Sequence, residues 1–198
     1  MNARTLLTSL ILLGTAGLSL AADPPKAVTK QEAMKQYMEK FGPAGPEHNL
    51  LKPLIGTWDA KVSYWVDPSQ PPMTSEGALT RRAVLGGRFI QEDFNGTFAG
   101  QPYTGLGTIG YDRAKKQFVN SWIDSMSTAM MNSTGTYDEA SKTFTYTSQE
   151  TCPITGKPVS MKDVVQILGP DEQKITMYQK YGDEPETKMM EIALKRKN

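Results

Sequence analysis

Hydrophobic positions recur at every second residue over most of this chain. From Trp58 to Val66, aromatic and aliphatic side chains alternate with Asp59, Lys61 and Ser63, which is the pattern of a half-buried β-strand. Further runs rich in β-branched and aromatic residues predict strands at about 74–85, 89–98, 103–111, 117–127, 129–138, 143–151, 159–168, 174–181 and 188–195. The pattern therefore predicts about ten strands in succession.

The segments between these strands have the composition of tight turns. Glycine, proline, asparagine or aspartate marks residues 112–116, 138–142, 153–157, 169–171 and 182–184, and Asn95-Gly96 is a further turn signal. Since these connections are too short to hold a helix, each strand should fold back antiparallel on its predecessor. Closure removes the two exposed edges of such a sheet, so we expect an all-β fold, a closed up-and-down antiparallel barrel.

A helical period precedes the strands. Thr29 and Glu32 have the spacing of a capping box, and apolar residues follow at helical intervals until Gly42-Pro43, which predicts a helix over residues 30–41. A second, shorter helical turn is predicted within residues 46–56. We expect both elements to pack on one end of the barrel.

The first residues have the pattern of an export signal. Arg4 precedes an apolar run from Leu6 to Leu20, and Ser19-Leu20-Ala21 is a small-x-small cleavage site. Small and hydroxyl residues interrupt the run, which argues against a retained membrane anchor. We therefore expect a periplasmic or secreted protein with a cleaved signal peptide at 1–22, a linker and helix at 23–45 and one barrel domain at 46–198.

Charge and cysteine content limit the partners. The formal net charge of +1 becomes 0 when residues 1–22 are removed with Arg4, and the remaining charges alternate in sign. Nucleic acid is therefore not an expected partner, and no membrane span should remain after cleavage. Cys152 is the only cysteine, so no internal disulfide can form, although an exposed thiol can join two chains in an interaction module. The oligomeric state stays open.

His48 is the only histidine. A single histidine excludes a multi-histidine metal site and any catalytic triad that needs a histidine base, so neither metal ligands nor catalytic residues are predicted. One histidine is enough to ligate haem, which leaves haem binding through His48 open beside a plain hydrogen-bonding role.

Glycines alternate along one predicted strand. Gly105, Gly107 and Gly110 match the spacing of the dinucleotide-binding fingerprint, but that motif requires a following helix. Here Tyr111-Asp112 leads directly into another turn and strand. The glycines are better explained as room for a bulky neighbouring side chain.

The predicted interior mixes aromatic and polar groups. Phe118, Asn120, Trp122, Asp124 and Met126 share one face of their strand, so the barrel is amphipathic inside if this face points inward. A barrel of eight or more strands can hold a small ligand. The many methionines are expected to be adaptable core filler, including Met126, Met130, Met131, Met189 and Met190.

Binding of a small apolar or amphipathic ligand is the function that this interior favours. Arg88 and Asp124 can form a buried ion pair facing the ligand. The alternative is a barrel enzyme, an isomerase or hydrolase with Glu92 or Asp124 as the base. Asp163 is a further charged residue within a predicted strand, and its facing is open. The predicted ligand contacts are Tyr64, Arg88, Tyr103, Trp122 and Asp124.

A series of motifs carries a resemblance to a known family. In order along the chain they are His48-x-Leu50-Leu51-x-x-Leu54-x-Gly56-x-Trp58, Gly86-Gly87-Arg88-Phe89, Gly100-Gln101-Pro102-Tyr103, Gly105-x-Gly107-x-x-Gly110-Tyr111-Asp112, Trp122-x-Asp124-Ser125-Met126 and Met190-Glu191-Ile192. Over about His48 to Lys197 the sequence resembles the bacterial family called domain of unknown function 1579. The resemblance implies a lipocalin- or calycin-like β-barrel, often in exported proteins, with no established activity and no catalytic residues.

Overall fold

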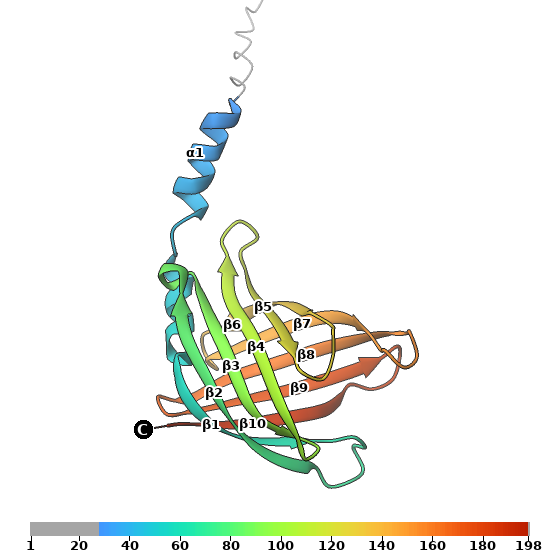
Figure 1. Ribbon diagram of the computed structural model, residues 1–198. Coiled ribbons are helices and arrows are strands. Elements are labelled where there is room, and N and C mark those ends of the chain that lie inside the picture. Colours follow the sequence, from blue (N-terminus) through green and yellow to red (C-terminus); the bar gives the residue numbers. More distant parts are fainter. Residues whose placement is uncertain (1–27, 198) are drawn as a thin grey trace, which may run out of the picture.

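Ten antiparallel strands close into a barrel in the computed structural model, which describes residues 28–197 (Figure 1). Each strand pairs with its neighbours in sequence, and the first pairs with the last, so no strand of this barrel keeps an unpaired edge. The predicted fold class is therefore confirmed, while the predicted export signal lies outside the described residues. The strands are β1 (Gly56–Tyr64), β2 (Met73–Val84), β3 (Phe89–Phe98), β4 (Gln101–Asp112), β5 (Gln117–Asp124), β6 (Met131–Asp138), β7 (Thr143–Thr151), β8 (Pro158–Gly169), β9 (Glu172–Tyr181) and β10 (Thr187–Arg196).

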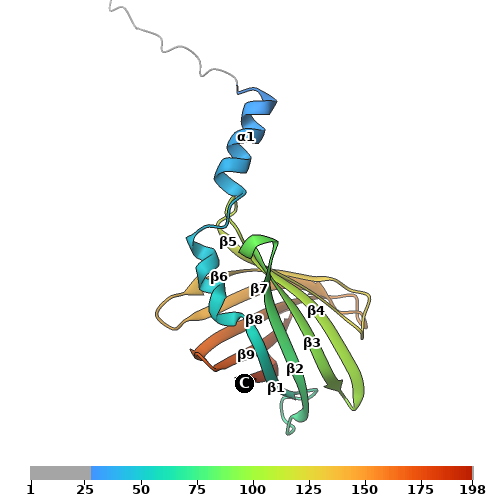
Figure 2. The same ribbon diagram turned by 60° about the vertical axis from the view of Figure 1, so that its left-hand side comes forward.

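The first helix, α1 (Lys30–Phe41), stands away from the barrel. It begins with the predicted capping box, in which the Thr29 hydroxyl accepts from the Glu32 N–H and the Glu32 carboxylate accepts from the Thr29 N–H. None of its residues is buried, and Figure 2 shows the helix projecting beyond the barrel from a second direction. The expectation that α1 packs on the barrel was wrong, because its aromatic residues Tyr37 and Phe41 contact each other instead of the core. Within residues 28–197, no helix has the length and apolar character required to cross a bilayer.

The second helical element, η1 (Pro46–Leu54), does pack on the barrel as predicted. It buries Leu51, Leu54 and His48 against the strands. Leu54 is followed directly by β1, whose Trp58 donates its indole N–H to the Leu54 carbonyl at 3.1 Å. We call this η1-covered region the closed end of the barrel.

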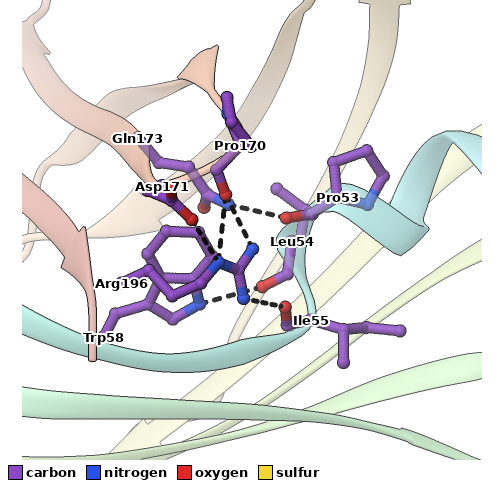
Figure 3. A network of polar contacts seen from close by, with 8 residues as sticks. All are labelled: Pro53, Leu54, Ile55, Trp58, Pro170, Asp171, Gln173 and Arg196. Atoms are coloured by element: carbon purple, nitrogen blue, oxygen red, sulfur yellow. Dashed lines mark hydrogen bonds and ion pairs between the residues drawn. The ribbon is translucent and has the colours of Figure 1, made fainter. Parts of the chain in front are cut away.

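Arg196 fastens the last strand to this closed end (Figure 3). Its guanidinium lies 4.1 Å from the centroid of the Trp58 ring, which is a cation–π contact. The same group donates to the carbonyls of Ile55 and Pro170 at 2.9 Å. Because Ile55 precedes β1 and Arg196 ends β10, these bonds hold together the two strands that close the barrel.

The turn expected at Asn95-Gly96 was wrong. Both residues lie within β3, where Gly96 pairs with Gly77 of β2. The chain reverses instead at Ala99-Gly100, where both residues have positive φ angles of 50° and 78°. Gly96 serves a close approach of backbones, because a Cβ added there would lie 2.9 Å from the Cα of Gly77.

Candidate functional site

The barrel contains a cavity of about 320 Å³. Every strand contributes inward-facing side chains to its wall. Asn120, Trp122 and Asp124 of β5 line the cavity together with Met126, which confirms the prediction of an amphipathic interior. The volume lies at the lower end of the range for pockets that hold small organic molecules.

The cavity reaches the surface beside the connection from β5 to β6. Met126 lines the cavity and is also 61% exposed. Met130 in the same connection is also exposed, so these two methionines are not the core filler that the sequence predicted. We call this region the open end. The methionines of the cavity wall are Met126, Met131, Met161, Met177, Met189 and Met190.

Trp122 occupies a slot that two glycines of β4 leave free. Gly107 is directly opposite Trp122 in the β4–β5 ladder, and a Cβ added to Gly107 would lie 2.8 Å from the indole ring. A Cβ on Gly105 would overlap the same ring. The glycine pattern thus makes room for a bulky neighbour, as predicted. The indole N–H of Trp122 donates to the hydroxyl of Tyr103 at 3.2 Å, which fixes the ring against the cavity wall.

A buried ion pair lies in the part of the cavity wall that β2 and β3 form. Arg81 of β2 donates its Nε–H to Oε1 of Glu92 on β3 at 2.7 Å. Its Nη1 donates to Gln173 of β9 at 2.7 Å, and Gln173 in turn donates to the Pro53 carbonyl of η1 at 2.9 Å. All three side chains are buried, so this chain of bonds links the cavity wall to the closed end.

Sequence reasoning did not find Arg81. It stands in the polar run Thr80-Arg81-Arg82, which is typical of a solvated segment. The available signal was strand alternation, because Leu79 and Arg81 share one face of β2, and Leu79 is buried.

Asp163 of β8 is a half-buried carboxyl group of the cavity wall. Among residues 28–197, no hydrogen bond or ion pair involves its side chain. Burial raises the pKa of Asp163 to about 6, with a further contribution from the negative charge of Glu92.

Tyr146 lies opposite Asp163 in the β7–β8 ladder. Its hydroxyl is buried without a hydrogen-bond partner in the described chain. Burial is the largest cause that raises the pKa of Tyr146. The charges of Glu92 and Asp163 raise this pKa further, whereas the charge of Arg81 lowers it. We refer to the cavity wall at Arg81, Glu92 and Asp163 as the polar end of the cavity.

The residues predicted as ligand contacts lie in three different places. Tyr103, Trp122 and Asp124 line the cavity. Burial raises the pKa of Tyr103 to about 12, and the nearby carboxylate of Asp124 adds to the shift. Tyr64 is buried beside the cavity wall, with its ring stacked on Phe98 at a centroid distance of 4.3 Å.

Arg88 lies outside the cavity. Its guanidinium donates to the carbonyls of Gly42 at 2.6 Å and Leu85 at 2.9 Å. The expected ion pair with Asp124 was wrong, because Arg88 stands just before the start of β3 whereas Asp124 opposes Gly105, far along the adjoining strand. The buried pair is formed by Arg81 and Glu92 instead.

His48 and Cys152 also lie outside the cavity wall. The Nδ1 atom of His48 accepts from the Gly45 N–H at 2.9 Å, and its ring packs edge-on against Tyr111, so the hydrogen-bonding role is the one observed. Cys152 is half-buried in the connection from β7 to β8. Over residues 28–197, no group of three or more histidine, cysteine, aspartate or glutamate side chains is placed to hold a metal ion.

Comparison with known proteins places this barrel among lipocalin-like folds. The crystal structure of Rv2717c from M. tuberculosis is similar at 17% identity and a TM-score of 0.59, covering 79% of this chain and all of that one. An S-type phycobiliprotein lyase, CPES from Guillardia theta, is similar at 11% identity and a TM-score of 0.54, covering 82% of this chain and 98% of that one. No curated protein matches the sequence. A family model matches residues 43–196, and the chain therefore belongs to the family described as Protein of unknown function (DUF1579).

Proposed function

We propose that this barrel binds a small, largely apolar molecule in its central cavity. The observation that carries the proposal is a cavity of about 320 Å³ that reaches the surface beside Met126. Its wall is mainly methionine, aliphatic and aromatic, with a smaller number of polar groups among them. This combination is typical of sites that bind small molecules.

Packing energetics support an occupant. An empty cavity destabilises a protein by about 24 cal/mol per Å³, so a dry cavity of this size would cost on the order of 8 kcal/mol, comparable with the whole stability of a domain. Water would satisfy the polar end, but the apolar part of the wall offers it few hydrogen bonds. An organic molecule that fills the apolar part removes this cost.

The wall also suits a ligand of variable shape. Methionine is unbranched and polarisable, so the six methionines can adjust to different contours. Trp122 is held rigidly in its glycine slot and offers a flat aromatic surface. A fixed aromatic face beside adaptable thioethers is suited to a flat or elongated apolar molecule.

A cavity-filling substitution tests this proposal. Ser148 lines the cavity, whereas the adjacent Thr147 of β7 is exposed on the outer face. The neutral fluorophore phenylnaphthylamine should bind the wild-type protein and the Thr147→Phe control with equal affinity. Ser148→Phe should weaken this binding at least tenfold, because the new ring occupies the ligand volume. Equal binding to both variants, or no binding to the wild-type protein, would overturn the proposal.

A barrel enzyme is the second candidate, and Asp163 is the observation that favours it. A carboxyl group with a pKa of about 6 in a cavity is suited to general acid–base catalysis near neutral pH. Glu92, one of the two bases considered from the sequence, is held by Arg81 instead. Any turnover in a screen of small esters and ketones should rise through about pH 6 and be lost in Asp163→Asn. A rate that survives this substitution would remove Asp163 as the base, and the absence of turnover in the wild-type protein would count against the enzyme hypothesis.

A further inference from the structure

We propose that the polar end of the cavity binds the positively charged head of an amphipathic amine, with Asp163 as its counter-ion. The inference rests on the proposed function and names the chemical class of the ligand. The apolar remainder of the molecule would occupy the methionine-lined part of the cavity.

The charge of the cavity wall favours a cation. Its charged residues are Arg81, Glu92, Asp124 and Asp163. Arg81 and Glu92 neutralise each other at 2.7 Å, and the second donor of Arg81 is taken by Gln173. Two carboxyl groups are then left without a compensating charge, so the interior has a negative potential.

Asp163 differs from Asp124 in its surroundings. Asp124 accepts from the Met126 N–H at 2.9 Å and belongs to the exposed open end. Asp163 has no hydrogen bond or ion pair within residues 28–197, and its ladder partner on β9 is the apolar Met177. A half-buried carboxylate without a partner is energetically unfavourable, and a bound ammonium group would supply both the charge and the donors that are missing.

The groups that face Asp163 fit this arrangement. Glu92 approaches from β3 and Tyr146 from β7. The positive charge of Arg81, which also acts on Tyr146, is bonded to Glu92 and Gln173. Burial and the negative charge of Glu92 together raise the pKa of Asp163 to about 6, and this negative charge would also attract an incoming cation.

The neighbouring wall accommodates an apolar chain. Val165 of β8 and Ile175 of β9 line the cavity near Asp163, with Met161 and Met177 beside them. Trp122 and Phe94 add aromatic faces, which attract cations as well as apolar groups. A fatty carboxylate of the same length would bring a third negative charge to this wall and should be rejected.

The matched compounds octylamine, octanol and octanoate test the inference by displacement of phenylnaphthylamine at about pH 7.5, where a free alkylamine is protonated. Octylamine should bind about tenfold more tightly than octanol, and octanoate more weakly than both. In Asp163→Asn, octylamine should fall to the affinity of octanol while octanol binds as before. Asp183→Asn, which changes an exposed carboxylate outside the cavity, should keep the wild-type order.

Proton release gives an independent measurement. At about pH 6, octylamine should displace a proton from Asp163, and calorimetry in buffers of different ionisation enthalpy should detect the release in the wild-type protein and not in Asp163→Asn. Equal binding of the three octyl compounds, or an amine preference that survives Asp163→Asn, would overturn the inference and leave the apolar-ligand function standing. Failure of phenylnaphthylamine and of all three compounds to bind would instead remove both.

Discussion

The two ends of the barrel differ in how they are held together. Hydrogen bonds join η1 to the first and last strands at the closed end, although Oε2 of Glu47 in η1 is buried without a partner in the described chain. At the closed end, the indole of Trp58, the guanidinium of Arg196 and the amide of Gln173 all have hydrogen-bond partners at 2.9–3.1 Å. Toward the open end, the hydroxyl of Tyr64 is buried and has no partner in the described chain, and Met126 is exposed. Buried polar groups without partners are rare in protein cores and are more often found at functional sites.

The closed end stabilises the fold, whereas the open end gives access to the cavity. The closed end contains Leu54 and Trp58, both fully buried, and it joins η1 to the first and last strands. The open end retains a cavity and flexible thioethers where a dry core would be more stable. The structure thus concentrates its stability at the closed end and leaves the remainder of the interior available to a ligand.

The largest effect is expected from breaking the buried ion pair of Arg81 and Glu92, which is linked to the closed end through Gln173. Arg81→Met leaves the Glu92 carboxylate buried without a partner and should lower the free energy of unfolding by about 3–5 kcal/mol. Arg82→Met is the matched control, because the neighbouring Arg82–Asp93 pair lies at the surface and contributes about 1 kcal/mol or less. Urea denaturation monitored by circular dichroism measures both.

A double variant shows whether the loss of stability comes from the lost attraction between Arg81 and Glu92 or from the carboxylate that the single variant leaves unpaired. Arg81→Met combined with Glu92→Leu removes both charges and should recover much of the stability lost in the single variant. Equal losses of stability for Arg81→Met and Arg82→Met would show that the buried pair contributes no more to stability than the surface pair does.

A smaller loss is expected from filling the glycine slot. Gly105→Ala places a methyl group where the Trp122 ring lies, so the ring must move, and stability should fall by about 1–3 kcal/mol. Gly169→Ala is the control, since a Cβ there meets no atom within 4 Å. The displaced indole should also lose its bond to Tyr103, which a shift in tryptophan emission would report. Unchanged stability and emission in Gly105→Ala would mean that the slot is not tightly filled.

Asp163→Asn should stabilise the protein at about pH 8, by on the order of 2 kcal/mol. The folded-state pKa of about 6 lies above the ordinary value of 3.8, so the folded protein binds more protons than the unfolded chain between these values. The stability that this group contributes is therefore complete below pH 3.8, falls as the pH rises through about 6 and then stays level. Asparagine carries no charge, so its advantage should disappear at about pH 4. A variant that is less stable than wild type at about pH 8 would contradict the burial of an unpartnered charge.

Strand alternation and turn composition were enough to predict the closed barrel from the sequence. Local pattern also placed Asn120, Trp122 and Asp124 on one face and explained Gly105 and Gly107 as space for a neighbour. These properties depend on residues close together in the chain or on the strict period of a strand.

The polar end of the cavity could not be predicted in the same way. Arg81, Glu92 and Gln173 come from three strands, and their meeting depends on register and on the tilt of the strands around the barrel. The sequence analysis chose Arg88 and not Arg81 as the interior arginine, yet the position of Arg88 just before β3 leaves it at the surface, bonded to Gly42. A single sequence gives the faces of each strand but not which cross-barrel residues face one another.

The smallest expected effect lies at the open end. Met126→Ser removes an apolar side chain that is already 61% exposed, so the free energy of unfolding should change by no more than about 0.5 kcal/mol. Phenylnaphthylamine binding should weaken by less than about threefold, because the other methionines of the wall can adjust around the ligand. Leu54→Ala at the closed end is the comparison and should lower stability by about 2–5 kcal/mol, since Leu54 is fully buried. If the two substitutions were equally destabilising in urea titrations, Met126 would be part of a packed core and the cavity would have no opening beside it.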